Sequence, residues 1–176
     1  KVLSIKKVLK RLNRSIKYVI LLDADSVLEA SKNTLTNLCK KLEKNNLGAA
    51  SFKIMVKNRK SILGKLFHIE SYTRDFWNSF VSKSHKLRCV PGGGSIFKRE
   101  VLEKALDSHS GEYYGEDLET TATVMENKHK IGYFSQIVSR TIMPSNTLGA
   151  LKQRIRWEAG AMRVYIRKRN FYIKNI

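Results

Sequence analysis

The feature that most constrains this chain is an apolar run that ends abruptly in two acidic residues. The run Tyr18 to Leu22 is followed at once by Asp23-Ala24-Asp25. A short, continuously apolar run is typical of a strand that is buried on both faces, so we predict a buried parallel strand over residues 17–22. Two carboxylates at the carboxyl end of such a strand lie in the crevice where open α/β sheets bind their ligands.

The rest of the chain alternates between helix-like and strand-like segments, which is typical of the α/β class. Apolar spacing predicts helices over residues 2–14, 35–44, 63–81 (one long helix or two), 99–107, 116–128 and 147–168. Strands are predicted at residues 17–22, 49–56, 89–97 and 131–134, and a loop at residues 23–32. No repeat, low-complexity tract or internal boundary is visible, so residues 1–176 are expected to form one domain.

Charge narrows the classes of partner. The 176 residues contain 34 Lys and Arg against 15 Asp and Glu, a formal net charge of +19. Such an excess implies an anionic partner, which can be nucleic acid, an anionic membrane face or a nucleotide diphosphate. The two cysteines, Cys39 and Cys89, have no metal-binding or redox spacing and are expected to be reduced thiols.

The first acid pair, Asp23 and Asp25, is the candidate metal site. Residues at i and i+2 project to the same side if the extended backbone continues past the strand. Hard divalent cations prefer oxygen ligands, so the pair suits a metal that holds a diphosphate. We expect Asp25 to be the main metal ligand and Asp23 to contact the nucleotide ribose as well. The alternative is an Asx turn that caps the next helix.

The second acid pair, Glu116-Asp117, follows Gly115 at the start of a predicted helix. Acids at this position can simply stabilise the positive end of the helix. The functional interpretation is a general base, because a carboxylate within hydrogen-bond reach can accept the proton of a sugar hydroxyl. We assign the catalytic role to Asp117, with Glu116 beside it.

Four residues crowded on the last predicted helix are candidates for binding phosphate and sugar: Gln153, Arg154, Arg156 and Trp157. Arginine forks bind phosphate oxygens in a bidentate manner. An indole offers a flat apolar surface for a sugar ring. Gln153, Arg156 and Trp157 can share one face of the helix. The alternative is a solvated basic face with one core tryptophan.

The segment Pro91 to Ser95 contains three consecutive glycines, which allow close backbone approach and positive φ angles. It is neither a Walker loop nor a dinucleotide-binding fingerprint. We interpret it as a wall on the acceptor side of the site, with a plain loop as the alternative. The four histidines have no metal-ligand spacing and are expected to be surface or core residues.

In combination, these motifs resemble the family-2 glycosyltransferases, most of all the processive membrane synthases of cellulose, chitin, hyaluronan and poly-N-acetylglucosamine. The matching segments are YVILLDADS, CVPGGGSIFKREVL, GEDLETTATVMENKHKIGYF and QRIRW. The resemblance implies a GT-A-like (nucleotide-diphospho-sugar transferase) fold, in which a mixed sheet is flanked by helices. It also implies that the N-terminal part of the fold is missing, as the start at Lys1 suggests, so that this fragment alone should bind a donor weakly or not at all.

The resemblance further implies an inverting, metal-dependent transfer from a UDP-sugar to the hydroxyl of a growing polysaccharide or another glycan acceptor. Asp23 and Asp25 would hold UDP and Mg²⁺ or Mn²⁺, and Asp117 would be the base. Gln153, Arg154, Arg156 and Trp157 would bind the diphosphate and the acceptor sugar. Gly115 stands where Thr or Ala is common, and we expect this difference to matter little.

The same resemblance implies a membrane-associated protein whose catalytic domain lies on the cytoplasmic side. Residues 159–176 are basic and aromatic. We interpret them as an interfacial helix before a membrane span, with an ordinary basic terminal helix as the alternative. The net charge of +19 also suits an anionic membrane surface.

Two other functions remain as alternatives. The first is a basic nucleic-acid-binding module, but no helix-turn-helix, zinc-finger or RRM signature is present. The acids at the strand end would also repel a phosphate backbone in the absence of a metal. The second is an inactive glycosyltransferase-like scaffold, against which the presence of all three motifs argues.

Overall fold

The computed structural model describes residues 1–85, 87–111 and 114–175. In this part of the chain, a five-stranded sheet has the strand order β1-β4-β3-β5-β2. Its strands are β1 (Tyr18–Leu21), β2 (Val27–Glu29), β3 (Leu47–Val56), β4 (Ser95–Lys98) and β5 (Lys130–Thr141). The two long strands β3 and β5 are parallel, and every other neighbouring pair is antiparallel. The sheet is therefore mixed.

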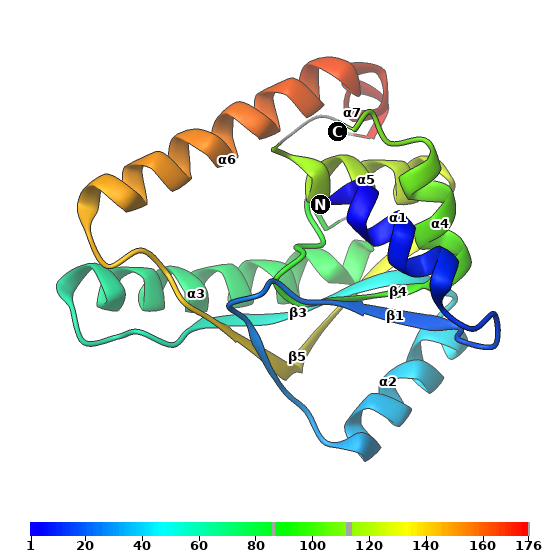
Figure 1. Ribbon diagram of the computed structural model, residues 1–176, viewed down its shortest axis with the longest axis horizontal. Coiled ribbons are helices and arrows are strands. Elements are labelled where there is room, and N and C mark those ends of the chain that lie inside the picture. Colours follow the sequence, from blue (N-terminus) through cyan, green and yellow to red (C-terminus); the bar gives the residue numbers. More distant parts are fainter. Residues whose placement is uncertain (86, 112–113, 176) are drawn as a thin grey trace.

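Helices cover both faces of this sheet (Figure 1). They are α1 (Val2–Arg11), α2 (Lys32–Lys44), α3 (Ile62–Val81), α4 (Arg99–Asp107), α5 (Glu116–Glu126), α6 (Thr147–Arg167) and α7 (Arg169–Asn175), with a 3₁₀ turn η1 (Ser82–Ser84) after α3. One core cluster joins α1, α4 and α5 to the sheet, and a second joins α2 to the opposite face.

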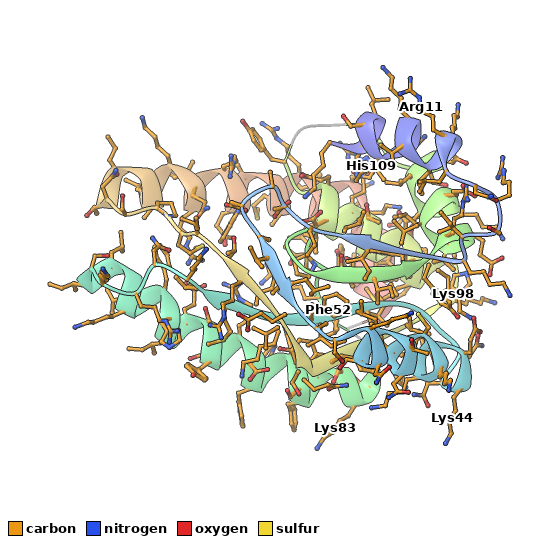
Figure 2. All side chains as sticks on the ribbon, turned by 60° about the horizontal axis from the view of Figure 1, so that its bottom comes forward. Arg11, Lys44, Phe52, Lys83, Lys98 and His109 are labelled. Carbon is orange, nitrogen blue, oxygen red and sulfur yellow. The ribbon has the colours of Figure 1, made fainter. Side chains whose placement is uncertain are left out.

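The sheet is buried on both sides because its strands alternate between these two clusters. In β3, Ala49 packs into the first cluster, whereas Ala50 and Phe52 pack into the second. Figure 2 shows Phe52 in the interior beside α2. Successive strand residues point to opposite faces, so a strand covered on both faces is mostly apolar, although β3 also contains the buried Ser51.

The prediction of a buried parallel strand at residues 17–22 was wrong in the direction of the strand and in its degree of burial. The strand β1 lies at an edge of the sheet, antiparallel to β4, and its residues are only half-buried. Its apolar run has a physical reason nonetheless, because Val19 packs against one core cluster and Ile20 against the other. A continuous apolar run indicates that both faces of a strand pack against other residues. It does not indicate whether the neighbouring strand is parallel or antiparallel.

Two further differences affect the region around the first acid pair. The predicted loop at residues 23–32 contains β2, and β5 continues from the predicted end at Phe134 to Thr141. These two additions pair with each other, with Val27 opposite Arg140. The glycine-containing segment at residues 89–97, in contrast, becomes a strand only at Ser95. Residues 23–26 therefore lie between the ends of β1 and β5.

The helix predictions agree well with the structure. The helix α4 has the predicted bounds, and residues 62–81 form one helix rather than two. The segment at residues 159–176, predicted as an interfacial helix, falls on the end of α6 and on α7, and Ile176 lies outside the described residues. Within the described residues, no helix combines the length and apolarity that a membrane crossing requires.

Candidate active site

The two predicted acid pairs meet around the side chain of Lys1. Its Nζ lies 3.0 Å from Asp23 Oδ1, 3.4 Å from Asp117 Oδ1 and 3.7 Å from Glu116 Oε1. Figure 1 shows the N-terminus beside the beginning of α5, where the second pair is located. Burial by itself would lower the pKa of the Lys1 amine. The carboxylates of Asp117 and Asp23 outweigh this effect and raise the pKa. We call these four side chains the carboxylate cluster.

Asp117 has the best-defined position in this cluster. It is the second residue of α5, a helix that begins directly after the αL residue Gly115, whose φ is 84°. Its Oδ2 accepts a hydrogen bond from the Gly92 backbone N–H at 2.7 Å, while its Oδ1 faces Lys1. Burial raises the pKa of Asp117, and the Lys1 ammonium and the Gly92 N–H partly offset this rise. The side chain remains 31% exposed, so it can still accept a proton from a ligand.

The glycine loop at residues 91–95 contributes backbone rather than side chains to the cluster. A Cβ at Gly92 would lie 2.2 Å from Lys1 Nζ, and a Cβ at Gly93 would lie 3.2 Å from Asp23 Oδ2. The predicted close backbone approach is therefore present, and it is made to Lys1 and Asp23 of the carboxylate cluster. A role for this loop as an acceptor wall stays a prediction.

Asp25 points to a different neighbour from Asp23. Thr141 Oγ1, at the end of β5, donates a hydrogen bond to Asp25 Oδ1 at 3.4 Å. A turn follows β1 immediately, in which the Ser26 N–H donates to the Asp23 carbonyl at 2.9 Å. The extended backbone needed to aim both acids to one side is therefore absent. The next helix, α2, is capped by Ser31, so neither acid caps it.

A divalent metal fits this region only together with a phosphate ligand. Among the residues that the structure describes, no three His, Cys, Asp or Glu side chains converge as a metal site. The available donors are the carboxylates of Asp23 and Asp25, and Lys1 Nζ lies against the first of them. Mg²⁺-type sites commonly take one or two carboxylates and complete their shell with water and substrate phosphates.

The helix α6 carries the other predicted binding residues, and Arg154 anchors it to α3. The Arg154 guanidinium forms an ion pair with Glu70 and lies over the rings of Phe67 and Trp157, at 5.5 Å and 5.0 Å from their centroids. Burial opposes the charge of Glu70, but the hydrogen bond from Arg154 and the nearby Arg74 hold its pKa below the usual value. Arg154 therefore already has a protein partner for its charge.

The remaining three residues of this group are arranged differently from the prediction. Arg156 lies over the ring of Tyr114, 5.6 Å from its centroid, so it is Arg154 that pairs with Trp157. Trp157 is 38% exposed. The side-chain oxygen of Gln153 is buried and has no hydrogen-bond partner among the described residues, which leaves an acceptor available to a ligand or a water.

Two glycines bring α6 against the turn that carries the second acid pair. A Cβ at Gly115 would lie 2.7 Å from the Gly160 carbonyl oxygen, and a Cβ at Gly160 would lie 2.7 Å from the Gly115 nitrogen. Gly115 also needs its positive φ. Contact and backbone conformation therefore both favour glycine at this position, and the expectation that Gly115 in place of Thr or Ala matters little for function stays a prediction.

A buried network behind the acid pair was not predicted from the sequence. Glu119, with a side chain only 3% exposed, accepts hydrogen bonds from the Ser110 N–H and hydroxyl at 2.9 Å and 2.7 Å. Arg167 at the end of α6 lies 3.1 Å from Glu119. The Gly111 N–H donates to His109 Nδ1, and His109 Nε2 lies 3.5 Å from Glu119. No sequence signal set Glu119 apart, because Glu116 and Glu126 are acids on the same face of the helix.

The cysteines are not part of this site. Both are free thiols. Burial, with Asp117 nearby, raises the pKa of the Cys89 thiol to about 12. A thiol with that pKa is protonated at neutral pH and is a poor nucleophile.

Comparison with known proteins identifies the class of site. A family model described as "Glycosyltransferase like family 2" matches residues 1–160. An N-acetylglucosaminyltransferase of Neorhizobium galegae is 22% identical, over 82% of this chain and 35% of its own length. A poly-beta-1,6-N-acetyl-D-glucosamine synthase of Staphylococcus epidermidis is 27% identical, over 87% of this chain and 37% of its own length. The chain thus spans little more than a third of the length of these curated relatives.

A solved structure confirms the fold. A mannosyltransferase from Pyrobaculum calidifontis, in complex with GDP-Man and Mn²⁺, superimposes with a TM-score of 0.67. The match covers 97% of this chain and 44% of that one, at 21% sequence identity. The GT-A-like arrangement of a mixed sheet flanked by helices, expected from the sequence motifs, is therefore confirmed.

Proposed function

The chain belongs to glycosyltransferase-like family 2, and we propose that it is the catalytic core for transfer of a sugar from a UDP-sugar to a hydroxyl of a growing polysaccharide or another glycan. The family was predicted from the motifs and is confirmed. The observation that supports this reaction most directly is the carboxylate cluster, in which Asp23, just after β1, and Asp117, at the start of α5, both contact the ammonium of Lys1.

Asp117 is the general base of the proposed reaction. Its carboxylate accepts the proton of the acceptor hydroxyl while that oxygen bonds to the anomeric carbon and the bond to the UDP oxygen breaks. A single displacement of this kind inverts the configuration at the anomeric carbon. The Gly92 N–H and Lys1 each engage one carboxylate oxygen of Asp117, which fixes its orientation before substrate arrives.

Asp23 and Asp25 are the proposed donor-side acids. They would hold Mg²⁺ or Mn²⁺ together with the diphosphate, and the ion would neutralise charge on the leaving group. Because Asp25 and Asp23 face different neighbours, donor binding must draw them to a common ligand. Lys1 already places a positive charge beside Asp23.

The residues of α6 have separate roles in this proposal. Arg156 is the phosphate-binding arginine, since Arg154 is occupied by Glu70. Arg154 instead holds Trp157 in place from one side of its ring. Trp157 offers the acceptor sugar a half-exposed indole, whereas the unpaired side-chain oxygen of Gln153 is buried and can bind the sugar only if the Gln153 side chain turns outward.

The donor site is tested by calorimetric titration of UDP into the full-length protein with and without Mn²⁺. We expect metal-dependent binding that Asp25→Ala weakens at least about tenfold. The matched control is Asp107→Ala, which removes an exposed acid from α4. Equal UDP affinity in the wild type and Asp25→Ala would contradict the assignment of Asp25. Because the relatives are an N-acetylglucosaminyltransferase and a poly-N-acetylglucosamine synthase, UDP-N-acetylglucosamine is the first donor to assay.

A further inference from the structure

The side of α3 that points away from the sheet is apolar. Its inner side holds the buried residues Gly64, Phe67 and Ser71. The opposite side carries large apolar side chains that are between 53% and 80% exposed. These are Ile62, Leu66, Ile69, Tyr72, Phe76, Trp77 and Phe80, which we call the α3 stripe. Large contiguous apolar patches on a protein surface usually mark interaction sites, so a stripe exposed along the whole helix indicates a partner.

The charges around the α3 stripe have one sign. The two acids of the helix are both paired within the protein: Glu70, on the flank that faces α6, pairs with Arg154, and Asp75 accepts a hydrogen bond from Lys53 at 2.6 Å. The exposed Lys65 lies next to the stripe on the helix, and Lys83 points away from the body of the molecule just beyond the helix (Figure 2). The stripe is therefore bordered by cations, and no acid of α3 is directed outward.

This combination identifies the chemistry of the partner. Apolar and aromatic side chains on one face, bordered by lysines, are typical of a helix that lies in the headgroup region of an anionic bilayer. We propose that α3 is a membrane-docking helix that inserts the α3 stripe into an anionic lipid surface. The net charge of +19 supplies the long-range attraction.

Docking through α3 would also orient the site. The helix has 20 residues and is about 30 Å long, so it provides one extended line of contact. Its inner side holds Arg154 through Glu70, and Arg154 in turn contacts Trp157. The helix that touches lipid on one side would therefore support the sugar-binding residues on the other. The docking proposal does not depend on sugar transfer.

The proposal is tested by vesicle flotation with the purified chain. We expect binding to vesicles of phosphatidylcholine with phosphatidylglycerol, and little binding to phosphatidylcholine alone. Replacing Phe76 and Phe80 together by serine should weaken this binding at least about 30-fold. Lys65→Gln should weaken it about fivefold and reduce its salt dependence. The matched control Leu3→Ser, which alters an exposed apolar residue of α1, should bind like the wild type.

A second readout is independent of any defect in folding. Trp77 emission should shift to shorter wavelength when anionic vesicles are added, and Trp77→Phe should abolish that shift. The proposal is overturned if the chain does not bind anionic vesicles, or if the double serine variant binds like the wild type. It is also overturned if sedimentation without lipid shows a dimer that the double variant dissociates, because the α3 stripe would then be an interface between copies.

Discussion

At the scale of single residues, the site is defined by what holds each carboxylate. The sequence motifs predicted which acids matter, and the structure adds Lys1 and the Gly92 N–H as the groups that hold Asp117. Neither had a signal of its own, because Lys1 belongs to a basic stretch and a backbone N–H has no sequence signature. The buried network of Glu119 was not predicted for a similar reason. An acid in a helix is expected to be solvated unless its burial is known.

The Lys1 side chain should control the pH dependence of transfer. Its ammonium opposes the rise in the pKa of Asp117 that burial causes. Lys1→Met should therefore raise the pKa of Asp117 further. Because only the carboxylate form accepts a proton, the rate should fall as pH decreases through that pKa. The acidic limb of the pH–rate profile should move to higher pH by about one pH unit in the variant. An unchanged limb, or one moved to lower pH, would show that Lys1 does not act on the base.

The buried Glu119 should contribute stability in a defined pH range. Burial opposes its charge, but the hydrogen bonds from Ser110, with His109 and Arg167, hold the pKa of Glu119 below the usual value. A lowered folded-state pKa stabilises the fold above the unfolded-state value and loses this effect as pH falls through the folded-state value. Glu119→Gln should cost about 2 kcal/mol at neutral pH. The difference in the free energy of unfolding between the wild type and Glu119→Gln should decrease only below about pH 4.

Urea unfolding at neutral and acidic pH measures this effect. Glu100→Gln, a change at an exposed acid of the neighbouring helix α4, is the matched control. A Glu119→Gln variant as stable as the wild type at neutral pH would show that the buried network has no net effect.

At the scale of elements, the sequence predicts helices better than strands. Helical spacing of apolar residues identified α4 with its observed bounds, because a helix records its own local periodicity. The direction of β1 and the pairing of β2 with the end of β5 depend on contacts distant in sequence. The pairing of β3 with β5 has a register shift at Phe52 and Lys53. This shift interrupts the alternation of side chains in β5 from which its full length could have been predicted.

The crossing of α5 and α6 is the contact between elements on which the site depends most. A side chain at Gly160 has no space, since its Cβ would lie 2.7 Å from the Gly115 nitrogen. Gly160→Ala should destabilise the protein by about 2 kcal/mol and displace α6 from the acid pair. We expect transfer to fall more than stability alone explains. Ala159→Ser, on the exposed side of α6, is the control. Wild-type unfolding and transfer in Gly160→Ala would contradict the importance of this crossing.

At the scale of the whole molecule, the motifs predicted the family and the fold, and both are confirmed. The motifs could not predict which neighbouring side chain each acid contacts. Asp23 and Asp117 converge on Lys1, whereas Asp25 turns toward Thr141, because the chain bends after β1. The association of this fold with a membrane remains a proposal, and the α3 stripe gives it a physical basis beyond net charge.

The most direct test is sugar transfer by Asp117→Asn in the full-length protein, measured beside UDP binding in the presence of Mn²⁺. Asparagine keeps the size of the side chain but cannot accept the proton. Transfer should fall by at least about 100-fold, while UDP affinity stays within about threefold of the wild type. Glu116→Gln, beside the base, should be much less affected. Transfer by Asp117→Asn at the wild-type rate would contradict the assignment of Asp117 as the base.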